Sequence, residues 1–156
     1  MKQGAKTRGR NALVLAVLAL AMLLVLLAAL LTQRKPGVTL DELPMTAEGA
    51  ARGYVRITAG KANSGEESRW AALPTAGEQT VVIRQGEGAD AMENVLRLTP
   101  EGMTIVSANC DNQDCVEQGT VTLDNKDARA LGSMIICLPH QVSVELYAAE
   151  ELLDAK

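Results

Sequence analysis

Three cysteines, Cys110, Cys115 and Cys137, are the residues of this 156-residue chain best suited to chemistry. Cysteine sulfur can form disulfides, exchange them with other thiols, or bind soft metal ions. A Cys110–Cys115 bridge would close a short turn and stabilise the fold by about 2 kcal/mol through chain entropy. A bridge from Cys137 to either of the others would close a larger loop, worth about 3 kcal/mol. All three pairings are open, and each leaves one thiol unpaired.

A metal site is a second use for the same sulfurs. Cys110, Cys115 and Cys137 together with His140, the one histidine, supply the three sulfurs and one imidazole of a tetrahedral Cys3His zinc site. Structural zinc sites favour paired ligands about two to four residues apart, and the four residues between Cys110 and Cys115 lie at that edge. The Cys3His set is therefore the alternative hypothesis.

A structural disulfide with a buried third thiol is the prediction, with no metal and no cofactor. Cys137 lies in the apolar run 134–138, which favours an inert, buried thiol. The spacing of Cys110 and Cys115 also differs from the C-x-x-C motif of thiol–disulfide oxidoreductases. Redox activity of these thiols is kept with metal binding as the alternative.

Other catalytic patterns fail on inspection. With one histidine, a Ser-His-Asp triad would need His140, and no G-x-S-x-G motif accompanies it. Gly86 and Gly88 begin like a dinucleotide-binding fingerprint, but Ala91 stands in place of the third glycine. The acidic residues lack the spacing of a calcium-binding loop. We therefore expect no catalytic residues, no small-molecule substrate and no enzymatic activity.

Short segments with period-2 alternation, separated by turn residues, are expected to position the cysteines as β-strands. These segments are 54–58, 69–73, 79–85, 94–99, 103–108, 120–123, 134–138 and 142–146. Pro100 and Gly102 are expected to form the tight turn of a hairpin between 94–99 and 103–108. Spacing of about ten residues without long helices predicts an all-β fold, a compact antiparallel sandwich or small barrel over residues 53–147.

The flanks of this domain are predicted to be simple. Residues 32–52, with two prolines and two glycines, are read as a linker, and 148–156 as a C-terminal turn or tail. Within the domain, the turn from Asn109 to Gly119 is rich in Asn and Asp, whose side chains bond nearby backbone. Gly119 is expected to adopt a positive φ at the entrance to the next strand.

Residues 12–31 are twenty consecutive Ala, Val, Leu or Met, without a charge, glycine or proline. About 20 such residues in a helix span the hydrocarbon core of a bilayer, and the run is longer than a cleaved signal peptide needs. We therefore predict an uncleaved signal anchor, one transmembrane helix that contacts the lipid bilayer. Four of the six flanking basic residues precede the run, which places the tail 1–11 in the cytoplasm and 36–156 outside the cell membrane.

Charge also limits the partners. Residues 36–156 contain nine Lys or Arg and nineteen Asp or Glu, a net charge of −10. Such a domain repels phosphate, so nucleic acid is excluded as a partner. An envelope protein is the partner class that remains.

Two segments give the chain a resemblance to a known family. Residues 106–119 hold a C-x4-C-V-x-x-G element, and 135–145 hold Cys137, Leu138 and Pro139 followed by alternating valines. Both resemble the NusG domain II family, small extracytoplasmic proteins of Gram-positive bacteria that usually carry an N-terminal membrane anchor. Two positions depart from the family pattern: Asp111 replaces its usual proline, and His140 replaces its usual asparagine.

The resemblance implies a small β-sandwich like the second domain of the transcription factor NusG. It carries no activity with it, because fold alone does not fix function. The sequence therefore predicts a single-pass, membrane-anchored bacterial protein whose extracytoplasmic β domain is a binding or accessory module of the cell envelope. The alternative is an envelope redox or metal-binding factor that uses the three cysteines and His140.

Overall fold

The computed structural model describes residues 14–24, 37–61 and 65–153, in two compact units that divide between Lys35 and Pro36. Residues 14–24 form a helix inside the predicted membrane segment, and their side chains are exposed. No helix within these described ranges is both long and apolar enough to cross a membrane. The rest of the predicted 12–31 segment and the tail 1–11 lie outside the described residues.

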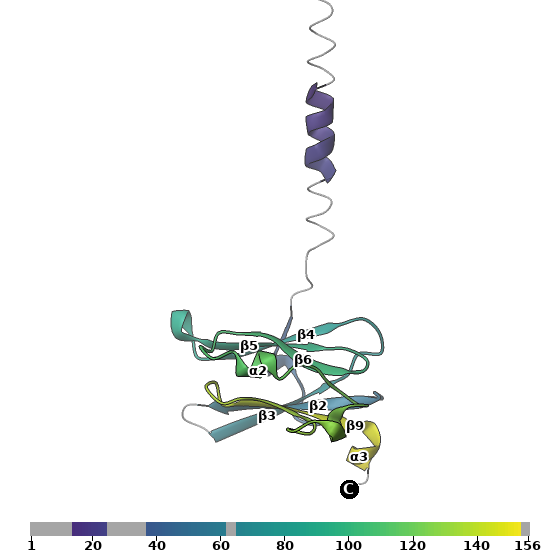
Figure 1. Cartoon of the computed structure of the whole chain (residues 1–156), viewed down its shortest axis with the longest axis vertical. Helices are drawn as coiled ribbons and strands as arrows, with labels where there is room; N and C mark the ends of the chain where they lie inside the picture. Colours follow the sequence, from purple (N-terminus) through teal and green to yellow (C-terminus); the bar gives the residue numbers. More distant parts are fainter. Residues whose placement is uncertain (1–13, 25–36, 62–64, 154–156) are drawn as a thin grey trace, which may run out of the picture. The chain divides into compact units, whose positions relative to one another are not determined.

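The second unit is a β-sandwich of two sheets (Figure 1). The five-stranded sheet has the order β1 (Val38–Thr39), β4 (Gln79–Gln85), β5 (Met92–Leu98), β6 (Gly102–Ala108) and β7 (Val121–Thr122). The four-stranded sheet has the order β3 (Gly65–Ala72), β2 (Gly53–Lys61), β9 (Val142–Ala148) and β8 (Met134–Cys137). All neighbouring strands are antiparallel except β1 and β4. The sandwich prediction is confirmed.

The barrel alternative was wrong. The described strands form two separate sheets, and each sheet ends in edge strands instead of closing on itself. Helical turns connect some of the strands: η1 (Leu40–Glu42), η2 (Gly88–Asp90), α2 (Asp114–Glu117) and η3 (Lys126–Ala128). A further short helix, α3 (Ala149–Leu153), follows the last strand.

Alternation along the strands fills the space between the sheets. In β2, Val55 and Ile57 are buried, and in β9 Val144 and Leu146 pack into the same core. Because successive side chains of a strand point to opposite faces, the residues between them lie on the outer face of the sheet. This pattern is what the sequence predicted for both strands.

The predicted turn at Pro100 and Gly102 joins β5 and β6 in an antiparallel hairpin. Gly102 is needed there because β7 crosses close to it: a Cβ atom on Gly102 would lie 2.0 Å from the carbonyl oxygen of Val121. The glycine thus permits a close approach of two backbones.

Residues 37–43 were expected in the linker but belong to the folded domain. Val38 pairs with Val81 in a parallel register, and Leu40 and Leu43 are buried in the core. The flanking prolines, Pro36 and Pro44, gave this segment the composition of a linker and hid its three apolar residues. The linker prediction 32–52 was therefore wrong for this part.

The strand expected over 69–73 begins earlier, at Gly65, and ends at Ala72. Ser68 faces outward and shares a hydrogen bond of 2.9 Å with Thr58 between their hydroxyl oxygens. Glu67 and Arg69 lie in the same phase as buried Ala71 and pair with each other. Backbone pairing with β2 runs from Ala72 to Gly65 without a need for apolar side chains on the outer face.

The C-terminal segment docks on the domain as a short helix, α3. Glu151 accepts a hydrogen bond of 2.6 Å from the backbone N–H of Ala148 and another from the Lys126 ammonium group. Lys126 is itself buried. The part of 148–156 that the structure describes is therefore a docked turn of helix.

Candidate functional site

The three cysteines come together in one buried cluster, called here the sulfur cluster: Cys110, Cys115 and Cys137. Their sulfur atoms all lie within 4.8 Å of one another, and those of Cys110 and Cys115 are 3.7 Å apart. All three are free thiols, and each side chain is at most 5% exposed. Residues 27 positions apart along the chain thus meet at one point in the core.

Each cysteine comes from a different element. Cys110 follows β6 of the five-stranded sheet, Cys115 lies in α2, and Cys137 ends β8 of the four-stranded sheet. The helix α2 contacts both β6 and β8. The sulfur cluster therefore lies where the two sheets and the helix meet.

Gln118 holds α2 against β8. Its side-chain amide donates a hydrogen bond of 2.8 Å to the carbonyl oxygen of Ile136 and accepts one of 2.9 Å from the N–H of Ile136. Because β8 is an edge strand, these backbone groups have no strand partner on that side. The paired amide fixes the distance between Cys115 and Cys137 from outside the cluster.

Side chains of the predicted turn hold its path, but that of Asn109 bonds the distant backbone at Ala91 and Glu93 instead of the nearby backbone that the sequence predicted. Asn109 accepts a hydrogen bond of 2.7 Å from the N–H of Glu93 and donates one of 2.8 Å to the carbonyl of Ala91. Gln113 has φ +55°, and its amide donates to the carbonyl of Ala108. Gly119 has φ +72°, so the predicted positive φ is confirmed.

Two buried polar residues lie beside the sulfur cluster. Asn94 of β5 donates a hydrogen bond from Nδ2 to the Cys115 sulfur at 3.6 Å. Its Oδ1 lies 2.8 Å from Nδ1 of His140, which therefore carries the proton of that bond. Asn94 is 1% exposed and His140 4%. The three residues form a chain of hydrogen bonds that ends on sulfur.

This arrangement separates His140 from the three cysteines of the predicted Cys3His set. Among the described residues, the group whose ligand atoms converge contains the three cysteines without His140. The ring of His140 is occupied by Asn94, and its carbonyl accepts a hydrogen bond from Gln85 at 2.9 Å. His140 thus contacts a residue that contacts sulfur.

Burial sets the charge state of this region. It raises the pKa of the Cys115 thiol to about 12, with hydrogen bonds to Cys137 and Cys110 adding to the shift. Burial also lowers the pKa of His140. Near neutral pH, Cys115 is therefore a thiol and His140 is uncharged, unless a cation enters the cluster.

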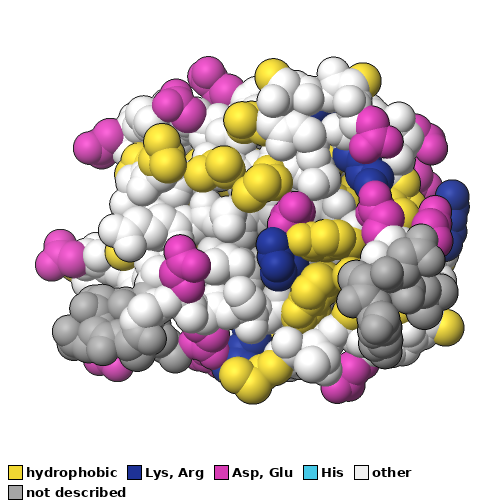
Figure 2. Space-filling model, turned by 90° about the horizontal axis from the view of Figure 1, so that it is seen from below, with side chains coloured by type: hydrophobic (Ala, Val, Ile, Leu, Met, Phe, Trp, Pro, Cys, Tyr) yellow, Lys and Arg dark blue, Asp and Glu magenta, His cyan; other side chains and the backbone are white. Residues whose placement is uncertain are grey.

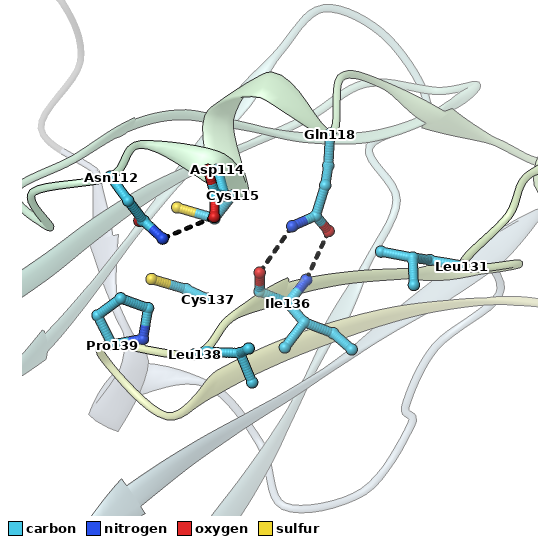
Figure 3. Close-up of a pocket in the computed structure, with 9 residues that line it drawn as sticks. All are labelled: Asn112, Asp114, Cys115, Gln118, Leu131, Ile136, Cys137, Leu138 and Pro139. Carbon is cyan, nitrogen blue, oxygen red and sulfur yellow. Dashed lines mark hydrogen bonds between the residues drawn. The ribbon is translucent and has the colours of Figure 1, made fainter.

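A small cavity of about 180 Å³ opens beside the sulfur cluster, between α2 and β8 (Figure 3). Cys115 and Cys137 lie at one end of it and Leu131 at the other. Leu138 on its wall is 80% exposed, and Leu131 is 44% exposed. Leu138 and Pro139, the motif residues of the sequence prediction, therefore line the cavity.

A second surface lies on the outer side of the four-stranded sheet and is called here the aromatic face: Tyr54, Arg56, Trp70, Glu145 and Tyr147. All the aromatic residues of the chain, one Trp and two Tyr, belong to it and none is part of the core cluster between the sheets. Tyr54, 7% exposed, is the buried member. Figure 2 views the molecule from this side, where hydrophobic side chains gather beside charged ones.

The aromatic face is held in place by its own contacts. Arg56 pairs across the sheet with Trp70 and Glu145. The Arg56 guanidinium donates to the Glu145 carboxylate at 2.6 Å and stacks on the Tyr147 ring, 5.4 Å from its centre. The rings of Trp70 and Tyr147 are also 5.4 Å apart. These contacts fix the side chains before any partner arrives.

Sequence reasoning missed Asn94 and the aromatic face, although each had a signal. Asn94 stands two residues before Leu96 and four before Leu98, in the buried phase of β5. A polar residue in that phase needs a buried partner. Trp70 and Tyr147 stand out of phase with the buried residues of their strands, which marks them as outward-facing.

The sequence model of the family described as NusG domain II matches residues 13–150, most of the chain. The chain belongs to the NusG domain II family. No match was found among curated protein sequences.

Solved structures of similar proteins come from three bacteria. The Lin0431 protein of Listeria innocua is 23% identical, with a TM-score of 0.44 over 62% of this chain and 97% of that one. A DUF1312 family protein of Enterococcus faecalis is 17% identical, with a TM-score of 0.42 over 61% and 98%. Another, from Ruminococcus gnavus, is 26% identical, with a TM-score of 0.38 over 62% and 99%.

The NusG domain II name describes a domain and assigns no ligand or reaction to it. The function of this member must therefore be argued from its own residues. Two features of this chain offer chemistry or a binding surface: the sulfur cluster inside the sandwich and the aromatic face outside it.

Proposed function

We propose that this NusG domain II protein is a non-catalytic binding module, anchored in the cell membrane and displayed on its outer side. The anchor is the apolar segment 12–31, and the charge difference between its flanks gives the orientation. The bound partner is a protein of the cell envelope. The aromatic face is the observation that carries this proposal.

The composition of the aromatic face is that of a binding surface. Trp, Tyr and Arg are the residues most enriched among those that dominate interface energetics. Here Trp70, Tyr147 and Arg56 are adjacent on the outer face of the sheet, partly exposed and fixed by mutual contacts. A fixed surface loses little side-chain entropy on binding. A sandwich of this size could have used its aromatic residues in the core instead.

Charge identifies the kind of partner. The net charge of −10 on residues 36–156 favours a protein with basic side chains around an apolar contact. Glu145 lies within the aromatic face with its side chain 21% exposed, so it is a candidate to meet such a residue. Association should therefore weaken as the salt concentration rises.

Site-specific photo-cross-linking in intact cells tests the proposal. A photoreactive residue at Ser143, on the outer face of β9, should give a discrete cross-linked product with an envelope protein. The same residue at Val95 faces outward on the opposite sheet and should not. Equal products from both positions, or none from Ser143, would contradict the proposal.

Matched arginine variants sharpen the test. Arg56 lies on the aromatic face and Arg97 on the outer face of the other sheet, and both side chains are 43% exposed. Arg56→Ala should reduce the Ser143 product at least about fivefold, since hot-spot residues cost 1 kcal/mol or more. Arg97→Ala should leave it unchanged. A loss with both variants would indicate a general effect of charge.

A further inference from the structure

We propose that the sulfur cluster is a binding site for one thiophilic cation, with Zn²⁺ as the ion that fits it best. This site lies inside the sandwich, so the inference is independent of the proposed role of the aromatic face. Cys110, Cys115 and Cys137 are the ligands. His140 is not a ligand and acts through Asn94.

Distances between the sulfurs support a shared ion. Two thiolates on one tetrahedral zinc, each about 2.3 Å from it, are about 3.8 Å apart. The sulfurs of Cys110 and Cys115 are 3.7 Å apart, and Cys137 lies within 4.8 Å of both. A disulfide needs about 2.05 Å between its sulfurs. The arrangement of all three is therefore closer to a metal site than to a bridge with a spectator thiol.

The hydrogen bonds behind the cluster support the same conclusion. Asn94 aims an N–H at the Cys115 sulfur, and His140 holds the Asn94 carbonyl from behind. Both side chains are more than nine-tenths buried. A neutral thiol gains little from such a donor, whereas a metal-bound thiolate is stabilised and oriented by one. A buried amide that donates to one sulfur, and is itself held by a buried imidazole, has a use once that sulfur carries charge.

Net charge favours zinc over copper. Three thiolates give a site charge of about −1 with Zn²⁺ and about −2 with Cu⁺, and a larger buried charge costs more. The fourth position of a zinc ion would have room on the cavity side, because Cys115 and Cys137 line that cavity. A water molecule or an added ligand can occupy it. Among the described residues, no fourth protein ligand converges with the three sulfurs.

Metal analysis of the purified full chain is the test. The chain, reduced and handled without oxygen, is dialysed against a zinc buffer, and bound zinc and protein are measured together. We expect one Zn²⁺ per chain. Dialysis against a Cu⁺ buffer in parallel identifies the preferred ion: preferential, stoichiometric copper binding would overturn the assignment of zinc.

Single variants locate the ligands. Cys110→Ser, Cys115→Ser and Cys137→Ser should each weaken zinc binding more than about 100-fold, because ligand loss exceeds the 10- to 100-fold typical of outer-shell changes. His140→Asn should keep the stoichiometry of one. Loss of zinc with His140→Asn would instead assign a Cys3His site. Asn112→Ala, on the cavity wall outside the cluster, is the control and should bind as the unchanged chain does.

Wild-type protein covers the case in which a variant does not fold. Bound zinc should slow alkylation of all three cysteines at least tenfold, a protection that a spectator thiol would not show. The inference is overturned if the folded, reduced chain binds no zinc. It is equally overturned if the chain isolated from membranes without reductant holds a disulfide between two of these cysteines and no metal.

Discussion

Gly119 and Gly102 serve the fold at the scale of single residues, each for a different physical reason. Gly119 has φ +72°, where side chains are strained, but a Cβ atom there would meet open space. Gly102 has no such φ, but its Cβ would lie 2.0 Å from a backbone carbonyl. The first substitution strains a dihedral angle, and the second displaces a strand.

Alanine at these positions should therefore have unequal effects. We expect Gly119→Ala to lower the free energy of unfolding by about 1 kcal/mol and Gly102→Ala by about 3 kcal/mol or more, since β7 must move. Urea denaturation measures both. Gly77→Ala, also at φ +72° in open space, is the control for Gly119 and should match it. A smaller loss for Gly102→Ala would contradict the close approach.

The hydrogen bond between Asn94 and His140 gives a second residue-scale prediction. Asn94→Ala leaves a buried ring nitrogen without its partner, at a cost of about 1 to 3 kcal/mol. The double variant Asn94→Ala/His140→Ala should be more stable than the sum of the single effects predicts, because the unpaired group is gone. Additive losses in a thermodynamic cycle of denaturation midpoints and m-values would argue against the bond.

The structural role of a residue could be predicted only where its neighbours in sequence determine that role. The positive φ of Gly119 depends on local backbone, so the sequence sufficed. The hydrogen bonds of Asn109 join backbone 16 and 18 residues away, which the sequence did not show. The meeting of Cys137 with Cys110 and Cys115 depends on how two sheets pack. The sequence indicated only that three sulfurs and one imidazole were available as ligands. His140 was included in that set because the sequence does not show that Asn94 bonds its ring.

At the scale of elements, the segment β1–η1 completes the core. Leu40 and Leu43 lie at 7% and 8% exposure beneath the sandwich edge. A chain that began at residue 53 would lose both, together with the parallel pairing of Val38 and Val81. The folded domain therefore starts near residue 37.

A pair of neighbouring residues tests that boundary. Leu43→Ala should lower the free energy of unfolding by about 2 to 5 kcal/mol, the usual loss for a buried leucine. Met45→Ala, two residues on and 67% exposed, should change it by less than about 0.5 kcal/mol. Equal stability of the two variants in thermal or urea unfolding would indicate that this segment is part of the linker and not of the folded domain.

Docking of α3 should make the stability of the domain depend on pH. The hydrogen bond from Lys126, followed by the one from the Ala148 N–H, lowers the pKa of Glu151. A carboxylate with a lowered folded pKa stabilises the fold above its unfolded pKa, and this contribution is lost as pH falls through the folded value.

Glu151→Gln should therefore lower the melting temperature at pH 7. The difference from wild type should shrink as pH falls below the unfolded glutamate pKa of about 4.3 and vanish below the lowered folded pKa. Thermal unfolding across this pH range is the measurement. Glu150→Gln, at the adjacent exposed position, is the control and should have little effect at pH 7. A Glu151→Gln deficit that persists at low pH would show that charge is not its cause.

Strands with a clear alternation could be predicted, and elements defined by their partners could not. The hairpin of β5 and β6 carries its own alternation and its own turn. β1 has two residues and exists because β4 offers it an edge. α2 has four residues, fewer than a helix needs to form alone, and its contacts with β6 and β8 stabilise it.

At the scale of the whole molecule, charge and hydropathy divide the chain into parts with different surroundings. All six basic side chains of residues 1–35 flank the apolar segment, and all nineteen acidic residues follow it. A strand order cannot be read from such patterns, because pairing joins residues far apart in sequence. The number of domains, and the positions along the chain where the charge changes between them, can be read from these patterns.

The proposed orientation predicts how protease added to intact cells will act. A tag after Lys156 should be removed, whereas a tag before Met1 should be protected until the membrane is opened. Immunoblotting of both tags, with a cytoplasmic protein as the control for lysis, gives the result. A C-terminal reporter active only in the cytoplasm would reverse the orientation, and a mature chain starting near Thr32 would remove the anchor.

The hydrogen bonds of the Gln118 side-chain amide affect how readily this protein would aggregate. By bonding both backbone groups of Ile136, it occupies the place that a neighbouring strand would take along β8. Open strand edges recruit other chains into shared sheets, and proteins commonly block them. Damage to the turn that carries α2 would therefore do more than loosen one copy. It would expose a strand edge on which other chains can pair and aggregate. Gln118 therefore helps to keep the protein soluble.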